Sequence, residues 1–207
     1  MKSLRPAAKP HAAHRFRLRV RVSLTIAPER KFVEDLVGFL SRILIIVTGI
    51  RLLPDRRYLL TIRHDNYKDT RKKSYEVFDE LPFWGNGQGY TNAKRNRYAI
   101  YDMGSGNLTY VADEWTDCSQ YSVLGNLLLY KAYPWKQSVM GIRPGVYLYN
   151  LSTGETKTLI APDSMRTGVV SLLDEKTALI AATDDSYKDT TKYCDFYHMD
   201  LADGSAS

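Results

Sequence analysis

Short runs of apolar and aromatic residues, each followed by a polar turn with glycine, recur along the chain from residue 58 onward. Three of these runs are versions of one another: Tyr98–Gly106, Val146–Gly154 and Phe196–Gly204. In each copy an Asp or Asn follows the run, and a Gly closes the turn. Successive copies are 48 and 50 positions apart (101 to 149, then 149 to 199). A repeat of about 40–50 residues made of short strands is typical of β-propeller blades.

A propeller blade has four antiparallel strands, a to d, counted outward from the axis. We interpret the repeated runs as strand c and the residues after two of the turns as strand d, Leu108–Val111 and Thr156–Ile160. Three short apolar runs bounded by turn residues are candidates for strand b. They are Tyr58–Ile62, Leu127–Tyr130 and Ala178–Ala182. Only three residues follow Gly204, so we expect the third strand d to be missing.

The sequence therefore predicts an all-β fold, a partial β-propeller of about three four-stranded antiparallel blades over residues 54–207. The fifteen tyrosines support this prediction, because aromatic side chains favour strands. Residues 1–53 do not follow the pattern, and we expect an irregular basic segment there. The alternatives for its first part are an exposed strand, an organelle transit peptide, a disordered tail or a stretch foreign to the natural protein.

Charge is distributed unevenly along the chain. Residues 1–57 carry 13 Lys/Arg against 4 Asp/Glu, whereas the remaining residues carry 16 against 19. The basic pI thus belongs to the N-terminal quarter, and we do not expect nucleic-acid binding by the body of the protein. The apolar run 36–50 is fifteen residues long and contains Arg42, so it is too short and too polar for a membrane span. A buried helix or strand pair is the expectation there.

The first predicted blade has a loop between strands b and c that is about twenty residues longer than the others. Within this insertion, glycines alternate with polar residues beside large aromatic side chains. Five residues are candidates for contacting a substrate or a partner domain: Phe83, Trp84, Asn86, Gln88 and Tyr90. The alternative is a packed aromatic corner that fixes the loop. The segment lacks the phosphate-loop pattern, and no βαβ unit surrounds it as a dinucleotide site would require.

Two segments carry a family resemblance. Residues 54–60 resemble the blade openings common in propellers of peptidases. The string Leu81-Pro-Phe-Trp-Gly-Asn-Gly-Gln-Gly-Tyr90, followed by Asn96–Asp102, resembles a propeller segment of acylaminoacyl-peptidase-like members of the prolyl oligopeptidase family of serine peptidases. The resemblance covers residues 54–207. It implies a propeller that gates a C-terminal α/β-hydrolase domain and selects short peptides.

The resemblance assigns no catalytic residue to this chain. The sequence contains no Gly-x-Ser-x-Gly elbow, and its four histidines lie outside any motif that activates a nucleophile. We therefore expect no hydrolysis by this polypeptide alone, although it resembles part of a hydrolase. Cys118 and Cys194 lack partners at metal-ligand spacing, so we expect no metal, no cofactor and a reducing, cytoplasmic location. The expected partners are the hydrolase domain and short peptides.

Other functions remain open at this stage. The main alternative is a stand-alone propeller-like module that binds a protein or ligand and closes by self-association through its open sheet edges. A basic RNA- or membrane-surface protein acting through residues 1–53 is a further alternative, and it predicts salt-dependent binding. A complete small enzyme is disfavoured, because its adjacent acid pairs fit turn and surface charges better than catalytic pairs.

Overall fold

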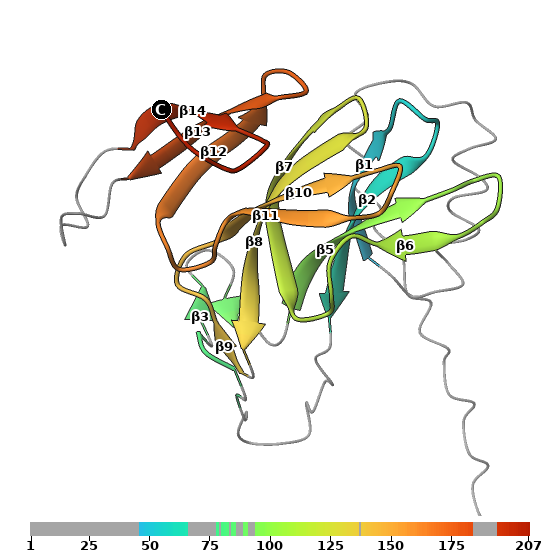
Figure 1. Ribbon diagram of the computed structural model, residues 1–207. Coiled ribbons are helices and arrows are strands. Elements are labelled where there is room, and N and C mark those ends of the chain that lie inside the picture. Colours follow the sequence, from blue (N-terminus) through green and yellow to red (C-terminus); the bar gives the residue numbers. More distant parts are fainter. Residues whose placement is uncertain are drawn as a thin grey trace, which may run out of the picture.

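Alternating apolar residues form three antiparallel sheets and one short hairpin in the computed structural model (Figure 1). The structure describes residues 46–65, 78, 80–82, 84–85, 89–90, 94–136, 138–183 and 194–207. The sheets follow one another along the chain, and each is built from consecutive strands as in a propeller blade. The predicted all-β fold, a partial propeller of about three blades, is confirmed.

The strands of each blade match the repeat closely. The first blade contains β1 (Ile46–Leu52), β2 (Tyr58–Asp65), β5 (Lys94–Tyr101) and β6 (Leu108–Tyr110). The second contains β7 (Thr116–Leu124), β8 (Leu127–Lys136), β10 (Gly145–Asn150) and β11 (Thr156–Ile160), and β9 (Val139–Met140) pairs with β8. The third contains β12 (Arg166–Leu172), β13 (Thr177–Thr183) and β14 (Asp195–Asp200). The predicted strands b, c and d lie in these elements, except that Val111 falls one residue beyond β6.

The turn after strand c has the same hydrogen bonds in every blade. The Gly N–H donates to the carbonyl of the Asp or Asn four residues earlier, at 2.8 Å in all three copies. The Asx side chain accepts backbone N–H groups within the turn. Gly106, Gly154 and Gly204 have φ of 73°, 77° and 80°. This left-handed conformation suits glycine, which explains why the repeat ends in that residue.

The first sheet begins ahead of residue 54, where the sequence placed the start of the propeller. Pro54 and Asp55 form the turn between β1 and β2, so strand a lies in the preceding apolar run. Residues 46–50 of that run belong to β1, whereas residues 1–45 lie outside the described part of the chain. The innermost strands β1, β7 and β12 each carry an irregularity of register, next to Thr48, Ser119 and Gly168. Such bulges sharpen the local twist of a strand.

The core lies between the blades. Each blade has a front face toward the preceding blade and a back face toward the following one. In β8, Leu128 and Tyr130 on the front face join the cluster shared with the first blade, and Leu129 on the back face joins the cluster shared with the third. This alternation follows from the two-residue period of a strand and explains why strand b is apolar on both faces. A third cluster covers the front of the first blade, around Leu60 and Ile62.

The last residues of the chain form one isolated bridge with β14. Ala206 forms an isolated bridge with Met199, and the backbones of His198 and Ser207 exchange two hydrogen bonds of 3.0 Å. The sequence predicted that strand d would be missing here, and the sheet of the third blade does have three strands, β12, β13 and β14. Among the described residues, this single antiparallel bridge follows the Gly204 turn in place of a strand.

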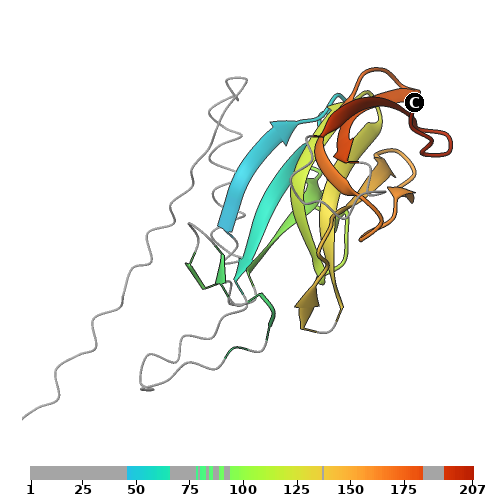
Figure 2. The same cartoon turned by 90° about the vertical axis from the view of Figure 1, so that its left-hand side faces the viewer.

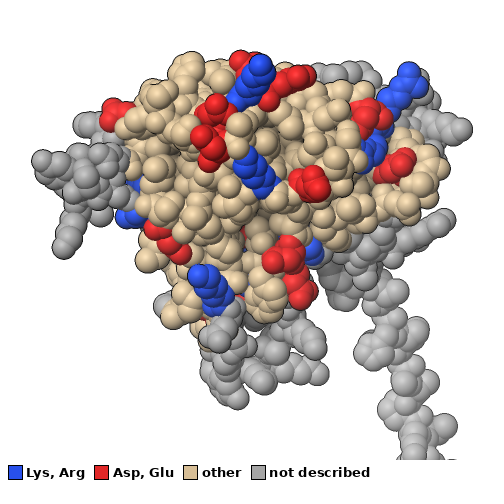
Figure 3. Space-filling view, in the orientation of Figure 1, with Lys and Arg blue, Asp and Glu red and all other residues tan. Residues whose placement is uncertain are grey.

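Figure 2 shows the same three sheets after a turn of 90°. A bond between the inner strands, from the Leu172 N–H to the Ser122 hydroxyl at 3.0 Å, ties the third blade to the second. On the face shown in Figure 3, acidic and basic side chains are interspersed. Within the described segments, no helix has the length and apolar character needed to span a membrane.

Candidate binding corner at the insertion

The candidate residues of the insertion lie on a short hairpin. Strand β3 (Trp84–Gly85) pairs antiparallel with β4 (Gly89–Tyr90), so Trp84 is opposite Tyr90 and Gly85 opposite Gly89. The Trp84 side chain is half exposed. Phe83, Asn86 and Gln88 lie outside the described residues, so the hairpin brings together two of the five candidates.

The root of the insertion joins the second blade. Leu81 forms a parallel bridge with Val139 of β9. Its N–H donates to the Ser138 carbonyl at 2.7 Å, and its own carbonyl accepts the Met140 N–H at 3.0 Å. Leu81 thus adds a third segment to the β8–β9 hairpin, and the two half-exposed side chains of the bridge present an apolar surface. A loop of one blade is in this way held on the next blade.

A buried arginine fixes this root from the inside. The Arg95 side chain is only 3% exposed and forms an ion pair with Glu80, the residue before Leu81. Its guanidinium carbon lies 4.4 Å from the ring centre of Trp135 and 5.1 Å from that of Trp115. Arginine suits this position, because its planar and weakly hydrated cation stacks on aromatic rings while pairing with a carboxylate. We call Glu80, Arg95, Trp115 and Trp135 the binding corner.

A further carboxylate lies beside the corner. The Asp117 side chain accepts the Asn96 N–H at 2.8 Å. Burial raises the pKa of Asp117, and the hydrogen bond from Asn96 and the positive charge of Arg95 only partly offset this effect. Within the described part of the chain, no group of three or more His, Cys, Asp or Glu side chains could hold a metal ion. The contacts of the corner are an ion pair and cation–π contacts within the protein, which fix the root of the insertion.

Sequence reasoning found the insertion but missed the corner that holds it. Arg95 occurs in the polar run 94–97, where nothing in the local sequence distinguishes it from a surface charge. Its partners are distant in sequence, and only the fold places Trp115 and Trp135 around it. One signal was present: the chain has three tryptophans, and Trp84, Trp115 and Trp135 belong to the insertion, the link between blades and the long β8 strand.

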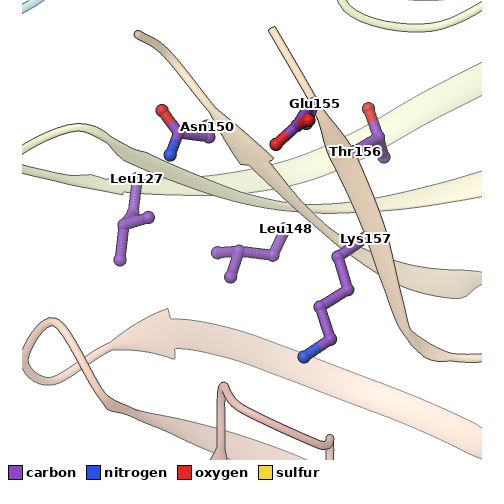
Figure 4. Close-up of a pocket in the computed structure, with 6 residues that line it drawn as sticks. All are labelled: Leu127, Leu148, Asn150, Glu155, Thr156 and Lys157. Atoms are coloured by element: carbon purple, nitrogen blue, oxygen red, sulfur yellow. The ribbon is translucent and has the colours of Figure 1, made fainter. Parts of the chain in front are cut away.

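A groove lies on the second blade, beside the third blade (Figure 4). This groove has a volume of about 460 Å³ and is lined by Leu127, Leu148, Asn150, Glu155, Thr156 and Lys157. The Lys157 amine donates to the carbonyls of Leu201, at 3.1 Å, and Ala202. The lysine thereby ties the two blades together. We interpret the groove as the seam between blades, because its cation is already engaged by the protein.

Comparison with known proteins supports the fold. No protein-family model matches the chain, and no curated protein matches its sequence. Among solved structures, it is similar to Pyrococcus horikoshii acylaminoacyl peptidase in an orthorhombic crystal form, with a TM-score of 0.52 and 15% identity. That match covers 78% of this chain and 24% of the peptidase. The chain has the fold of part of an acylaminoacyl peptidase.

Two further structures give the same result. The uncomplexed Pyrococcus horikoshii enzyme has a TM-score of 0.51 at 15% identity, covering 78% of this chain and 25% of that one. An acylaminoacyl peptidase in complex with Z-Gly-Gly-Phe-chloromethyl ketone also has a TM-score of 0.51 at 15% identity, with 78% and 24% covered. The chain therefore spans about a quarter of the length of these peptidases. At this identity the likeness concerns the fold alone.

Proposed function

We propose that this chain is a non-catalytic propeller portion of a serine peptidase of the prolyl oligopeptidase type, acting in the cytoplasm. Its role would be to gate and select short peptides for an α/β-hydrolase domain outside this sequence. The observation that carries the proposal is the shared fold with acylaminoacyl peptidases over 78% of the chain. The insertion string from Leu81 to Tyr90, on which the family resemblance rests, gives independent support.

Within this proposal, the insertion is the contact surface. The half-exposed Trp84, with Phe83, Asn86, Gln88 and Tyr90, would face peptides or the hydrolase domain, and the binding corner would hold the insertion in place. A long loop on a rigid scaffold is a common position for binding residues. The ion pair of Arg95 with Glu80 and the Leu81 bridge supply that rigidity from two sides.

The coding DNA on both sides of this sequence tests the proposal first. We expect an open frame that continues into further blades and a hydrolase domain with a Gly-x-Ser-x-Gly elbow. A stop codon directly after Ser207, together with an intact frame from Met1, would overturn it. If the longer protein exists, Trp84→Ala should change the ratio of its activities on short peptides and on unfolded proteins. Leu173→Ala, on the third blade, is the matched control.

The second candidate is a stand-alone module that binds a protein or ligand and self-associates. One observation favours it: the back face of the third blade is uncovered at Phe196, which is 69% exposed. Large exposed apolar side chains in a sheet often mark an interaction site.

A further inference from the structure

The front of the first blade is buried, although no described sheet lies on it. Leu60 and Ile62, on the central strand β2, are fully buried, and Val47 on β1 is 4% exposed. Together with Ala99 of β5 they belong to a cluster of their own. An apolar sheet face without a covering layer leaves its side chains in water, as Phe196 shows on the third blade at 69% exposed. Another part of this chain therefore lies on the front of the first blade.

The second blade does not supply this cover. Among the described strands, every extensive contact between the first sheet and another sheet is with β7. That contact is on the back of the first blade, where the Tyr98 ring meets Tyr121 of β7 edge-on at 5.2 Å. Because side chains alternate between the two faces of a strand, Tyr98 and Ala99 point in opposite directions. The cover of the front thus comes from residues outside the described ranges.

Residues 31–44 have the apolar pattern that such a cover requires. They lie outside the described part of the chain, and Ile45 alone separates them from β1, the first strand of this sheet. Their apolar members are Phe32, Val33, Leu36, Val37, Phe39, Leu40, Ile43 and Leu44. The others are Lys31, Glu34, Asp35, Gly38, Ser41 and Arg42. At about 100° per residue, the first set falls within about 160° of the circumference of a helix and the second set on the opposite side. The pattern predicts an amphipathic helix with one continuous apolar side.

The other stretches outside the described ranges fit the front less well. Residues 66–77 and 184–193 are rich in charged residues and lack an apolar run. Over residues 15–22, arginines alternate with apolar residues, and this stretch is farther from β1 along the chain. A helix over residues 31–44 also has the right length, because it would span about 21 Å and the seven residues of β1 span about 23 Å. The acidic pair Glu34 and Asp35 near its start and Arg42 near its end would complement the helix dipole.

We propose that residues 31–44 form an amphipathic helix that caps the front of the first blade, with its apolar side on Leu60 and Ile62. The helix takes the place of a preceding blade, so a blade that closes a ring would have to displace it. This inference goes beyond the proposed function, because it concerns the segment before β1 and does not depend on a hydrolase domain.

The test is the access of a thiol reagent to the buried front at pH 8, in the full chain. Ile62→Cys, in a Cys194→Ser background, places a thiol at the centre of the front. Cys118 reports unfolding, because it is buried in the cluster between the first and second blades. We expect neither thiol to react in the native protein. Leu40→Asp should raise the labelling rate at position 62 at least about tenfold and leave Cys118 unlabelled, since a charge on a buried apolar contact is costly.

The matched control is Ser41→Asp, which adds the same charge one residue later, on the polar side of the helix. It should leave position 62 protected. If Leu40→Asp exposes both thiols alike, the milder Leu36→Ala on the same side replaces it, and the same result is expected.

Three results would overturn the inference, and each leaves the peptidase proposal to its own test. The first is rapid labelling at position 62 before any change in residues 31–44, with Cys118 unlabelled, because the front would then be open. The second is an equal effect of the variants on the two sides of the helix. The third is labelling that Leu18→Asp raises and Leu40→Asp does not, which would assign the cover to residues 15–22.

Discussion

Arg57 of the first blade donates from Nη2 to the carbonyl oxygen of Leu151 in the second blade, at 2.5 Å. Asp55 holds the same guanidinium through bonds of 2.8 and 2.5 Å. Lys157 repeats the arrangement one blade later, with its amine on the carbonyl of Leu201. Leu151 and Leu201 are equivalent in the repeat, since each follows the Asx residue of the turn. A cation from one blade therefore binds the turn of the next.

The first prediction concerns the strength of this tie. Arg57→Met should lower the free energy of unfolding by about 1 kcal/mol, because it removes a charge-assisted hydrogen bond whose donor is partly exposed. Arg56→Met is the matched control, since Arg56 is exposed in the same turn. Urea denaturation of the two variants measures the difference. Equal losses would show that the tie contributes nothing to stability.

The second prediction is the pH dependence of the same tie. Burial alone would raise the pKa of Asp55, but the hydrogen bonds and positive charge of Arg57 outweigh burial and lower it below the ordinary value of 3.8. A lowered carboxyl pKa stabilises the fold above the unfolded value, and that stability is lost as pH falls through the folded pKa. The stability gap between wild type and Arg57→Met should therefore narrow below pH 3.8. A gap that stays constant to pH 2.5 would contradict this.

The third prediction compares two turn glycines. Gly106 and Gly204 both have positive φ, so alanine is strained at either. At Gly106 a Cβ would meet nothing within 4 Å, whereas at Gly204 it would lie 2.5 Å from the Leu159 carbonyl oxygen of the second blade. We expect Gly106→Ala to cost about 1 kcal/mol and Gly204→Ala about 1–3 kcal/mol more. Thermal unfolding measures both, and equal costs would mean that the blades can separate there.

The fourth prediction concerns the binding corner. Glu80→Leu leaves the Arg95 cation buried without this carboxylate and should lower the free energy of unfolding by about 3 kcal/mol. Arg95→Met leaves the Glu80 carboxylate without its cation and should lower it by a similar amount. The double variant should be more stable than the sum of the single losses by at least about 1 kcal/mol. Denaturant unfolding of the wild type, the two single variants and the double variant gives the four free energies of this double-mutant cycle. Additive losses would show that the pair does not hold the insertion root.

The fifth prediction distinguishes the two cysteines. Burial raises the pKa of the Cys118 thiol to about 12, so almost no thiolate forms at pH 8. Cys194 is only partly buried, with its sulfur 3.5 Å from the Thr183 hydroxyl oxygen. A thiol reagent at pH 8 should therefore label Cys194 alone in the native protein and both residues after unfolding. Mass spectrometry of the labelled peptides shows which cysteine has reacted. In Cys194→Ser, the native protein should remain unlabelled.

Most of the strand pattern could be predicted from the sequence, because turn chemistry and a two-residue apolar period are local signals. The strands at Leu127, Thr156 and Tyr58 begin where the pattern placed them. The inner strands were harder to find. β7 and β12 contain polar residues and bulges that interrupt their alternation, and β1 lay in a run next to the basic segment.

The candidate site was predictable only as a segment. Glycines and aromatics identified the insertion, but not the short hairpin in which Trp84 pairs with Tyr90. The residues that hold it, Arg95 and Trp135, act through contacts between different blades. Such contacts have no local sequence signature. A buried ion pair in particular looks like two surface charges until the fold brings tryptophans around it.

The bridge between Leu81 and Val139 also has a kinetic consequence. The Leu81 and Met140 amides donate the two hydrogen bonds of one bridge between two blades, so we expect them to open to solvent together. In native-state hydrogen exchange the two amides should therefore show the same free energy of opening, although 59 positions (81 to 140) separate them in the chain. The loop of the first blade and the hairpin of the second would then share the same opening events.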